Sequence, residues 1–134
     1  MPVGETLDDT AFSVKQTADL ERTLTLAHEM TGSRFCIFVG PLPAGRDSAL
    51  SLQRDLNDPS NSVLVAVDPE QRIIEIVTGL ATQETLDNRA CQLACMTMIS
   101  RFSIGDIAAG VRDGVLVLAE HARRPPVLHT NQPG

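Results

Sequence analysis

The spacing of hydrophobic positions changes along this 134-residue chain, and the changes predict where helices and strands begin and end. From Thr17 to about Thr31, apolar residues recur every three or four positions, as on a helix with one buried face. They are Leu20, Leu24, Ala27 and Met30. We expect Thr17 as the N-cap, Asp19 and Glu21 in the first turn, and Gly32 at the C-terminal cap.

Two apolar runs further along predict strands. Arg34–Val39 is the first, and Ser62–Val67 holds five consecutive apolar residues, which is typical of a strand buried on both faces. A short helix beginning at Asp47 or Ser48 separates them, so the two strands should be parallel and joined by a right-handed crossover. After a four-residue turn, Arg72–Val77 is the expected antiparallel partner.

The second half of the chain is expected to be helical. Asp87 can cap a helix from Asn88 to about Arg101, and this helix is apolar on nearly all sides. Its apolar positions are Ala90, Cys91, Leu93, Ala94, Cys95, Met96, Met98 and Ile99. A helix of this kind usually lies at the centre of its domain or is covered by a partner.

A last helix should follow the sequence Ser103-Ile104-Gly105-Asp106, in which the Ser103 hydroxyl and the Asp106 carboxylate form a variant capping box. It should run to about Ala122, with a stripe made of Ile107, Val111, Val115 and Leu118. Gly110 and Gly114 lie four residues apart on it and would allow close helix packing.

These elements predict a single α/β domain. We expect an α/β/α sandwich in which a small mixed sheet of three to four strands is flanked by helices. Residues 1–16 should be a polar lead-in, 17–124 the domain, and 125–134 a flexible tail that begins with two prolines.

Composition narrows the classes of partner. Eleven Lys and Arg against 17 Asp and Glu give a net charge of −6, and the chain has no Trp or Tyr. An acidic surface with few aromatic residues disfavours binding to nucleic acid and to anionic membranes. We expect a protein partner, with a homo-oligomer among the possible assemblies. Three cysteines, no signal peptide and no membrane-spanning run predict a cytoplasmic protein without direct membrane insertion.

Most catalytic patterns are absent from the sequence. There is no nucleophile elbow, and the loop from Gly40 to Arg46 carries prolines where a phosphate loop needs backbone donors. Cys91 and Cys95 do not form a zinc motif with the histidines, and we interpret both, like Cys36, as small core residues.

One group of polar residues is a candidate site. Asp58 and Asn61 lie just before the buried strand, Arg72 opens its hairpin partner, Gly79 follows that partner, and Asp87 caps the next helix. Asp87 can reach the end of the sheet where Gly79 follows its strand, whereas Asp58 and Asn61 can face either that end or the opposite one. Carboxylate and amide oxygens suit calcium or magnesium, so Asp58 and Asp87 are candidate metal ligands. Asp58, Asn61, Arg72 and Gly79 are candidate ligand-binding residues.

A purely structural interpretation of the same residues is also open. Turns and helix caps select Asp and Asn for their local hydrogen bonds, and Arg72 can pair with Glu70.

Residues 58–68 (DPSNSVLVAVD), residues 72–79 (RIIEIVTG) and the pair Leu86-Asp87 together resemble the TPM domain family. The resemblance covers the chain from about 17 to about 122 and is closest to a short stand-alone actinobacterial branch of unknown function. It implies an α/β/α sandwich. TPM-like domains include thylakoid-lumen proteins tied to photosystem II repair, some with weak acid-phosphatase activity and calcium binding.

The chain departs from the TPM pattern at its rim. Ser62 stands where the family usually has glycine, and the glycine-x-glycine after the second strand is reduced to Gly79-Leu80-Ala81 with no acidic residue at 80–83. Together with the apolar helix at 88–101, these departures favour a non-catalytic protein-interaction or oligomerising module. The alternative is a weak acid phosphatase, a hydrolase dependent on calcium or magnesium, with Asp58 and Asp87 holding the metal and Arg72 clamping the anion.

Overall fold

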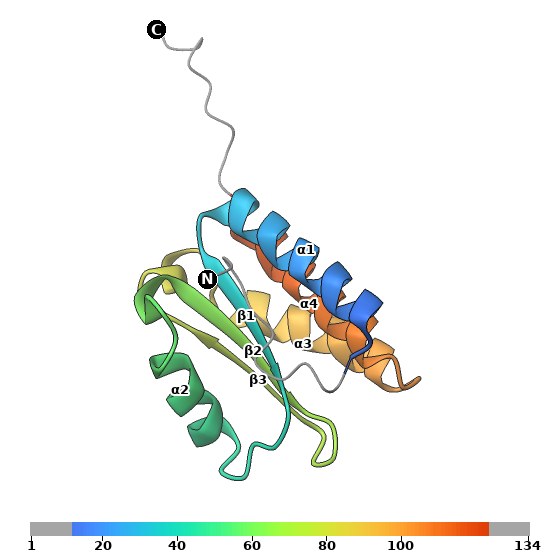
Figure 1. Ribbon diagram of the computed structural model, residues 1–134. Coiled ribbons are helices and arrows are strands. Elements are labelled where there is room, and N and C mark those ends of the chain that lie inside the picture. The colour runs from blue at the N-terminus through green and yellow to red at the C-terminus, as the bar shows by residue number, and fades with distance from the viewer. Residues whose placement is uncertain (1–11, 124–134) are drawn as a thin grey trace, which may run out of the picture.

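The computed structural model describes residues 12–123, which form an α/β fold of four α-helices and a three-stranded sheet (Figure 1). In chain order the elements are α1 (Val14–Thr31), β1 (Arg34–Val39), α2 (Arg46–Arg54), the 3-10 turn η2 (Pro59–Asn61), β2 (Ser62–Asp68), β3 (Ile73–Thr78), the 3-10 turn η3 (Thr82–Glu84), α3 (Asn88–Phe102) and α4 (Ile107–His121).

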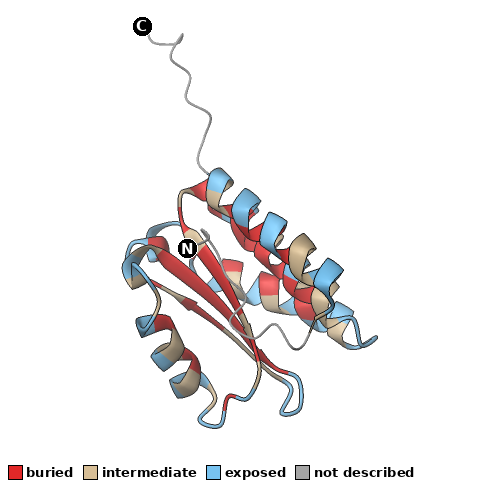
Figure 2. Cartoon of the chain, in the orientation of Figure 1, coloured by how far each residue is buried: buried red, intermediate tan, exposed pale blue. Residues whose placement is uncertain are grey.

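The sheet has the order β1-β2-β3. The β1 and β2 strands are parallel, with Arg34 opposite Ser62, and β2 and β3 are antiparallel, with Val63 opposite Thr78. Every residue of the central strand β2 is buried (Figure 2). Both pairings predicted from the apolar runs are therefore confirmed.

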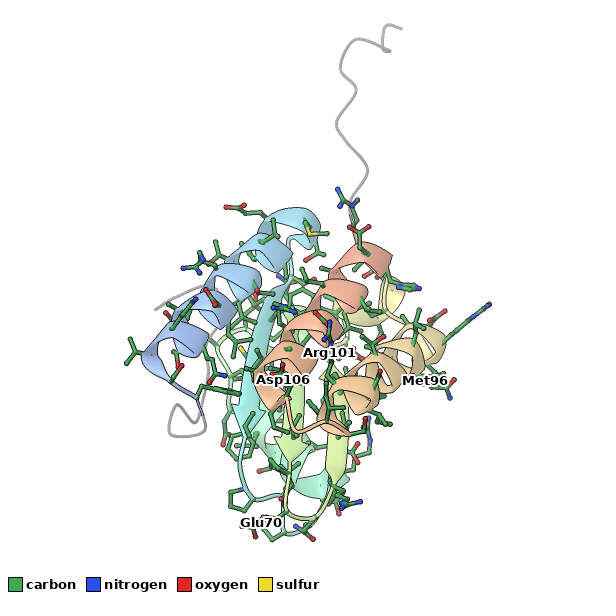
Figure 3. The ribbon with its side chains drawn as sticks, turned by 90° about the vertical axis from the view of Figure 1, so that its right-hand side faces the viewer. Glu70, Met96, Arg101 and Asp106 are labelled. Carbon is green, nitrogen blue, oxygen red and sulfur yellow. The ribbon has the colours of Figure 1, made fainter. Side chains whose placement is uncertain are left out.

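Helices cover the two faces of the sheet, which confirms the predicted α/β class. Alternate strand residues point to opposite faces. On one face Phe35, Ile37, Val63 and Val65 pack with α1, α3 and α4, while on the other face Leu64 and its neighbours pack beneath α2. The first face carries α1, α4 and α3 side by side, with α4 between the other two (Figure 3).

The central helix of this layer is α4, not α3. Its buried residues are Gly110, Val111, Gly114, Val115, Leu118 and Ala119, whereas α3 buries only Ala90, Ala94 and Met98. Of the two settings expected for this helix, a central position is therefore wrong for α3, and cover by a partner stays a prediction. Helix α3 lies at the outer edge of the helical layer, above β3, because α4 fills the space against the centre of the sheet.

The glycine pair on α4 allows the close helix packing expected of it. A Cβ atom added at Gly110 would come within 2.3 Å of Phe102 Cε1, and one at Gly114 within 2.7 Å of Met98 Cγ. Both contacted side chains belong to α3, so the missing side chains let the two helices approach.

Several predicted boundaries need correction. The first helix begins at Val14, because Ser13 accepts a hydrogen bond from Gln16 N and forms a capping box with it, so Thr17 is not the cap. Asp19 and Glu21 consequently lie beyond the first turn, whereas Gly32 caps the C-terminus in the left-handed conformation as expected, with φ 81°.

Two further boundaries differ slightly. Helix α2 begins at Arg46, before the two predicted starts, with Gly45 as its N-cap. For α4, Asp106 itself is the N-cap and accepts from Ala109 N, while the Ser103 hydroxyl donates to Ser100 O, so the predicted capping box is wrong.

The predicted lead-in at 1–16 is replaced from Val14 onward by helix α1, and residues 1–11 lie outside the described part of the chain. The predicted tail at 125–134 also lies outside it. Among residues 12–123, we find no helix whose length and hydropathy would let it cross a bilayer.

Candidate functional site

The predicted site residues occupy both ends of the β2–β3 hairpin. Asp58, Asn61 and Gly79 lie at the end where β2 begins and β3 stops. Arg72 lies in the turn at the other end, six residues before Thr78, which is about 20 Å along an extended strand. The structure therefore brings three of the four candidate ligand-binding residues together and separates Arg72 from them.

Asn61 joins two parts of the fold through its side-chain amide. Its Nδ2 donates to Gly32 O over 2.9 Å, and its Oδ1 accepts from Ser33 Oγ over 3.5 Å. These bonds fasten the start of β2 to the link between α1 and β1.

Gly79 contacts the backbone of the η2 turn. A Cβ atom at Gly79 would lie 2.0 Å from Pro59 O and 2.3 Å from Ser60 O. Gly79 N donates to Ser62 O, and Ala81 N donates to Ser60 O, each over 2.9 Å. The glycine is needed so that the chain leaving β3 can approach the turn before β2.

The two candidate metal ligands have separate local roles. Asp58 adopts a left-handed backbone conformation with φ 52°, and its carbonyl accepts from Asn61 N and from Ser62 Oγ. The Asp87 carboxylate caps α3, as predicted, by accepting from Ala90 N over 2.9 Å. Residues 12–123 contain no group of three or more His, Cys, Asp or Glu side chains arranged to hold a metal ion. Binding of calcium or magnesium by Asp58 and Asp87 stays a prediction.

Arg72 differs most from its predicted setting. It belongs to the turn and not to the strand, with a left-handed φ of 58°, and within the described residues its side chain forms no ion pair with Glu70. Glu70 lies near the tip of the hairpin (Figure 3). Arg72 instead lines a cavity of about 470 Å³ whose other walls include Ile99 and Phe102.

Asp68, which was not among the predicted site residues, organises the turn of the β2–β3 hairpin. This buried carboxylate accepts from Leu42 N over 2.9 Å, from Gln71 Nε2 over 2.7 Å, and from Glu70 N and Gln71 N over 3.1 and 3.2 Å. The hydrogen bond from Leu42, followed by that from Gln71, lowers the pKa of the Asp68 carboxyl from its ordinary value. An acid that ends an otherwise apolar strand was the available signal.

A groove of about 1000 Å³ lies between strand β3 and helix α3. One wall is formed by β3 from Ile74 to Thr78, and the other by the N-cap Asp87 together with Cys91 and Met96 of α3. Arg46 also lines it, and its Nη1 donates to Glu75 Oε1 over 2.9 Å. Apolar and polar side chains are mixed along this surface.

Cys91 and Cys95 line this groove while packing against the edge of the core, so they are half-buried and not enclosed as predicted. Burial raises the pKa of both thiols, with a further contribution from Asp87 at Cys91 and from Cys91 at Cys95. A raised pKa favours the neutral thiol, which is a poorer nucleophile than the thiolate. Cys36 is buried as expected.

Beside the groove, α3 exposes three large apolar side chains. Leu93 is 44% exposed, Met96 66% and Ile99 56%. Met96 lies on the outer side of α3, away from α4 (Figure 3). We call these three residues the α3 patch.

A family model described as Domain of unknown function (DUF5130) matches residues 1–119. The chain belongs to this family. Two curated relatives from Mycobacterium tuberculosis, Uncharacterized protein MT2543 and Uncharacterized protein Rv2468c, are each 31% identical to this DUF5130 domain over 111 residues. The matched region covers 81% of the chain but 65% of each relative, so the chain spans just under two thirds of their length.

Solved structures share the fold at low sequence identity. The BA42 protein from Bizionia argentinensis has a TM-score of 0.69 at 14% identity, covering 83% of this chain and 81% of that one. The N-terminal domain of a P. gingivalis protein has a TM-score of 0.65 at 18% identity, covering 90% and 81%. The N-terminal domain of the cg2496 protein from Corynebacterium glutamicum reaches 0.63 at 15% identity, covering 91% and 78%.

Proposed function

We propose that this DUF5130 chain is a non-catalytic protein-interaction module that binds its partner through the α3 patch and the groove beside β3. The observation that carries the proposal is the exposure of Leu93, Met96 and Ile99 on one helix. Exposed apolar side chains that lie together beside a groove are typical of interaction surfaces. Covering these half-exposed side chains would contribute about 3 kcal/mol to binding.

The contrast with α4 supports this role for α3. Both helices are rich in apolar residues, but α4 buries six of its fifteen residues and α3 three of fifteen. Within residues 12–123, the apolar side chains on the outer side of α3 therefore remain exposed to solvent. The expectation that such a helix is covered by a partner becomes part of the proposal.

We also propose that the family is related to TPM domains. The order of residues in 58–68, 72–79 and Leu86-Asp87 supports the relationship, as does the arrangement of helices on both faces of the sheet. The phosphatase alternative gains no support from the geometry, because Arg72 lies at the opposite end of the hairpin from Asp58.

Site-specific photo-crosslinking tests the interaction surface. The photoreactive residue p-benzoylphenylalanine is placed at Met96 on α3, and for comparison at Leu26, a 47% exposed apolar residue on α1. Irradiation of cells producing each variant should give a discrete protein adduct from position 96 and none from position 26. Absence of an adduct at 96, or the same adducts from both positions, would contradict the proposal.

A further inference from the structure

We propose that a second copy of this chain is the partner, and that the two β3 strands pair antiparallel across a two-fold axis to form a six-stranded sheet. The proposal deepens the proposed function, because it uses the same groove and the same α3 patch. In the resulting dimer the two α3 helices lie on the same face of the joined sheet, where Met96 and its neighbours cover one another.

The two edges of the sheet differ in how well they are protected. Both β1 and β3 are edge strands. Four of the six residues of β1 are buried, whereas β3 has only Ile76 and Val77 buried. Neither strand contains the proline or lysine that natural proteins place on edges to prevent pairing, so the difference in burial distinguishes them. The β3 strand is therefore the edge available for strand addition.

A β3 edge is complementary to itself. Two identical strands related by a two-fold axis present each N–H to a carbonyl of the other strand, as in any antiparallel pair. Because β3 borders a groove of about 1000 Å³, space for an added strand lies directly beside it. The apolar, β-branched sequence IIEIVT suits such pairing.

Side-chain parity selects the register. Residues that lie opposite each other in an antiparallel pair point to the same face of the sheet. The two-fold axis must therefore lie midway between one residue of β3 and the same residue of the second copy. An axis at Glu75 would place two carboxylates opposite each other, which is unfavourable. An axis at Ile76 places Glu75 opposite Val77 of the second copy and Ile74 opposite its Thr78. This register pairs most of the strand without a like-charge contact.

Charge at the edge also permits self-association. Glu75 is the only charged residue of β3, and Arg46 pairs with it over 2.9 Å, so the edge is locally balanced. Each whole chain nevertheless carries a net charge of −6, and two copies repel over longer distances. Salt screens this repulsion, so dimerisation should strengthen as ionic strength rises from about 0.01 M to 0.15 M.

The interface would be small. At roughly 35 Å² per interface residue, the groove walls and the α3 patch would bury about 500 Å² on each copy, or about 1,000 Å² in total. This area lies at the lower end of specific interfaces, so we expect a dissociation constant between about 1 and 100 μM.

Sedimentation equilibrium of the full chain from about 1 to 500 μM tests the dimer. Wild type is compared with Met96→Glu in the α3 patch and with Val14→Glu, which adds the same charge at an 89% exposed residue of α1. We expect reversible dimerisation that Met96→Glu weakens at least about tenfold and that Val14→Glu leaves within about twofold. Thermal melts of all three proteins show that the fold is retained.

Hydrogen exchange tests the strand pairing independently of Met96. At concentrations above the dissociation constant, the alternate β3 amides that do not bond to β2 should exchange more slowly than in dilute samples. A chain that stays monomeric to about 500 μM at 0.15 M salt overturns the dimer, as does a dimer whose β3 amides gain no protection.

The two proposals fail separately. A monomeric chain that still gives a heterologous adduct from position 96 overturns the dimer and leaves the interaction module standing. A monomeric chain with no adduct at 96 overturns both.

Discussion

Replacing Gly79 with alanine should destabilise the whole domain, because the added methyl group meets backbone and not a movable side chain. The Cβ would lie 2.0 Å from Pro59 O and 2.3 Å from Ser60 O, more than an ångström inside normal contact. Either η2 or the chain after β3 must shift. Such a shift breaks the hydrogen bonds from Gly79 N to Ser62 O and from Ala81 N to Ser60 O, each 2.9 Å long.

The expected magnitude follows from these contacts. Overpacking costs about 1–3 kcal/mol, and two lost backbone hydrogen bonds cost about 1 kcal/mol each. We therefore expect Gly79→Ala to lower the free energy of unfolding by about 3–5 kcal/mol. For a chain of this length, that change lowers the melting temperature by roughly 10–20 °C.

Chemical denaturation followed by circular dichroism measures the change directly. Ser60→Ala is the matched control: it alters an exposed side chain in the same turn without adding a Cβ, and should stay within about 0.5 kcal/mol of wild type. If Gly79→Ala unfolds at the same denaturant concentration as wild type, the close approach is not a packing constraint. The glycine at position 79 would then be better explained by a ligand that contacts its backbone.

Four further substitutions, in three experiments, test other parts of the structure. Met98→Ala should lower the free energy of unfolding by about 2–5 kcal/mol, because Met98 is fully buried. Met96 is 66% exposed, so Met96→Ala should change it by less than about 0.5 kcal/mol. Equal effects of the two substitutions in urea unfolding would refute the assignment of the buried and exposed faces of α3. Asp68 has a folded pKa below its ordinary 3.8, so its stabilisation is present above about pH 4 and is lost as pH falls through the lower folded value. Asp68→Asn should remove that loss, and acid titrations of stability with equal slopes below pH ~4 would contradict it. Arg72→Gly should raise the free energy of unfolding by about 0.5–1 kcal/mol. The strain of a left-handed backbone at φ 58° is relieved in glycine, and this gain exceeds the entropic cost of ordering a glycine. A lower melting temperature would show instead that the arginine side chain stabilises the turn.

Much of the fold could be predicted from local pattern. The apolar run at Ser62–Val67 specified a doubly buried strand, and the connection lengths specified its parallel and antiparallel partners. The cap at Asp87 was also predictable, because an aspartate before an apolar helix accepts from a backbone amide three residues on. Local signals competed at Ser13 and Thr17, where two hydroxyl residues could cap the same helix and Gln16 decided between them.

The candidate site was less predictable. Arg72 and Gly79 are close in sequence, yet the extended strand β3 separates them in space. The residue types alone did not indicate that the two lie at opposite ends of the hairpin. The sequence left open whether Asp58 and Asn61 face the same end of the sheet as Gly79 or the opposite end. It also did not show that Asn61 uses its amide to bond Gly32 and Ser33. Such bonds join segments about thirty residues apart in sequence, and they exist only once the helix and strand have packed.

The sequence by itself determined the order of elements, the buried strand and the caps at Gly32 and Asp87, because periodicity, propensity and capping act over a few neighbouring residues. Only the tertiary structure decided which of two apolar helices is central. The glycines on α4 let α3 approach it from the side, α4 fills the space above the sheet, and α3 keeps Leu93, Met96 and Ile99 exposed. Which face of a helix is covered depends on competition among all the elements for the same sheet surface, and that competition is not encoded in any single segment.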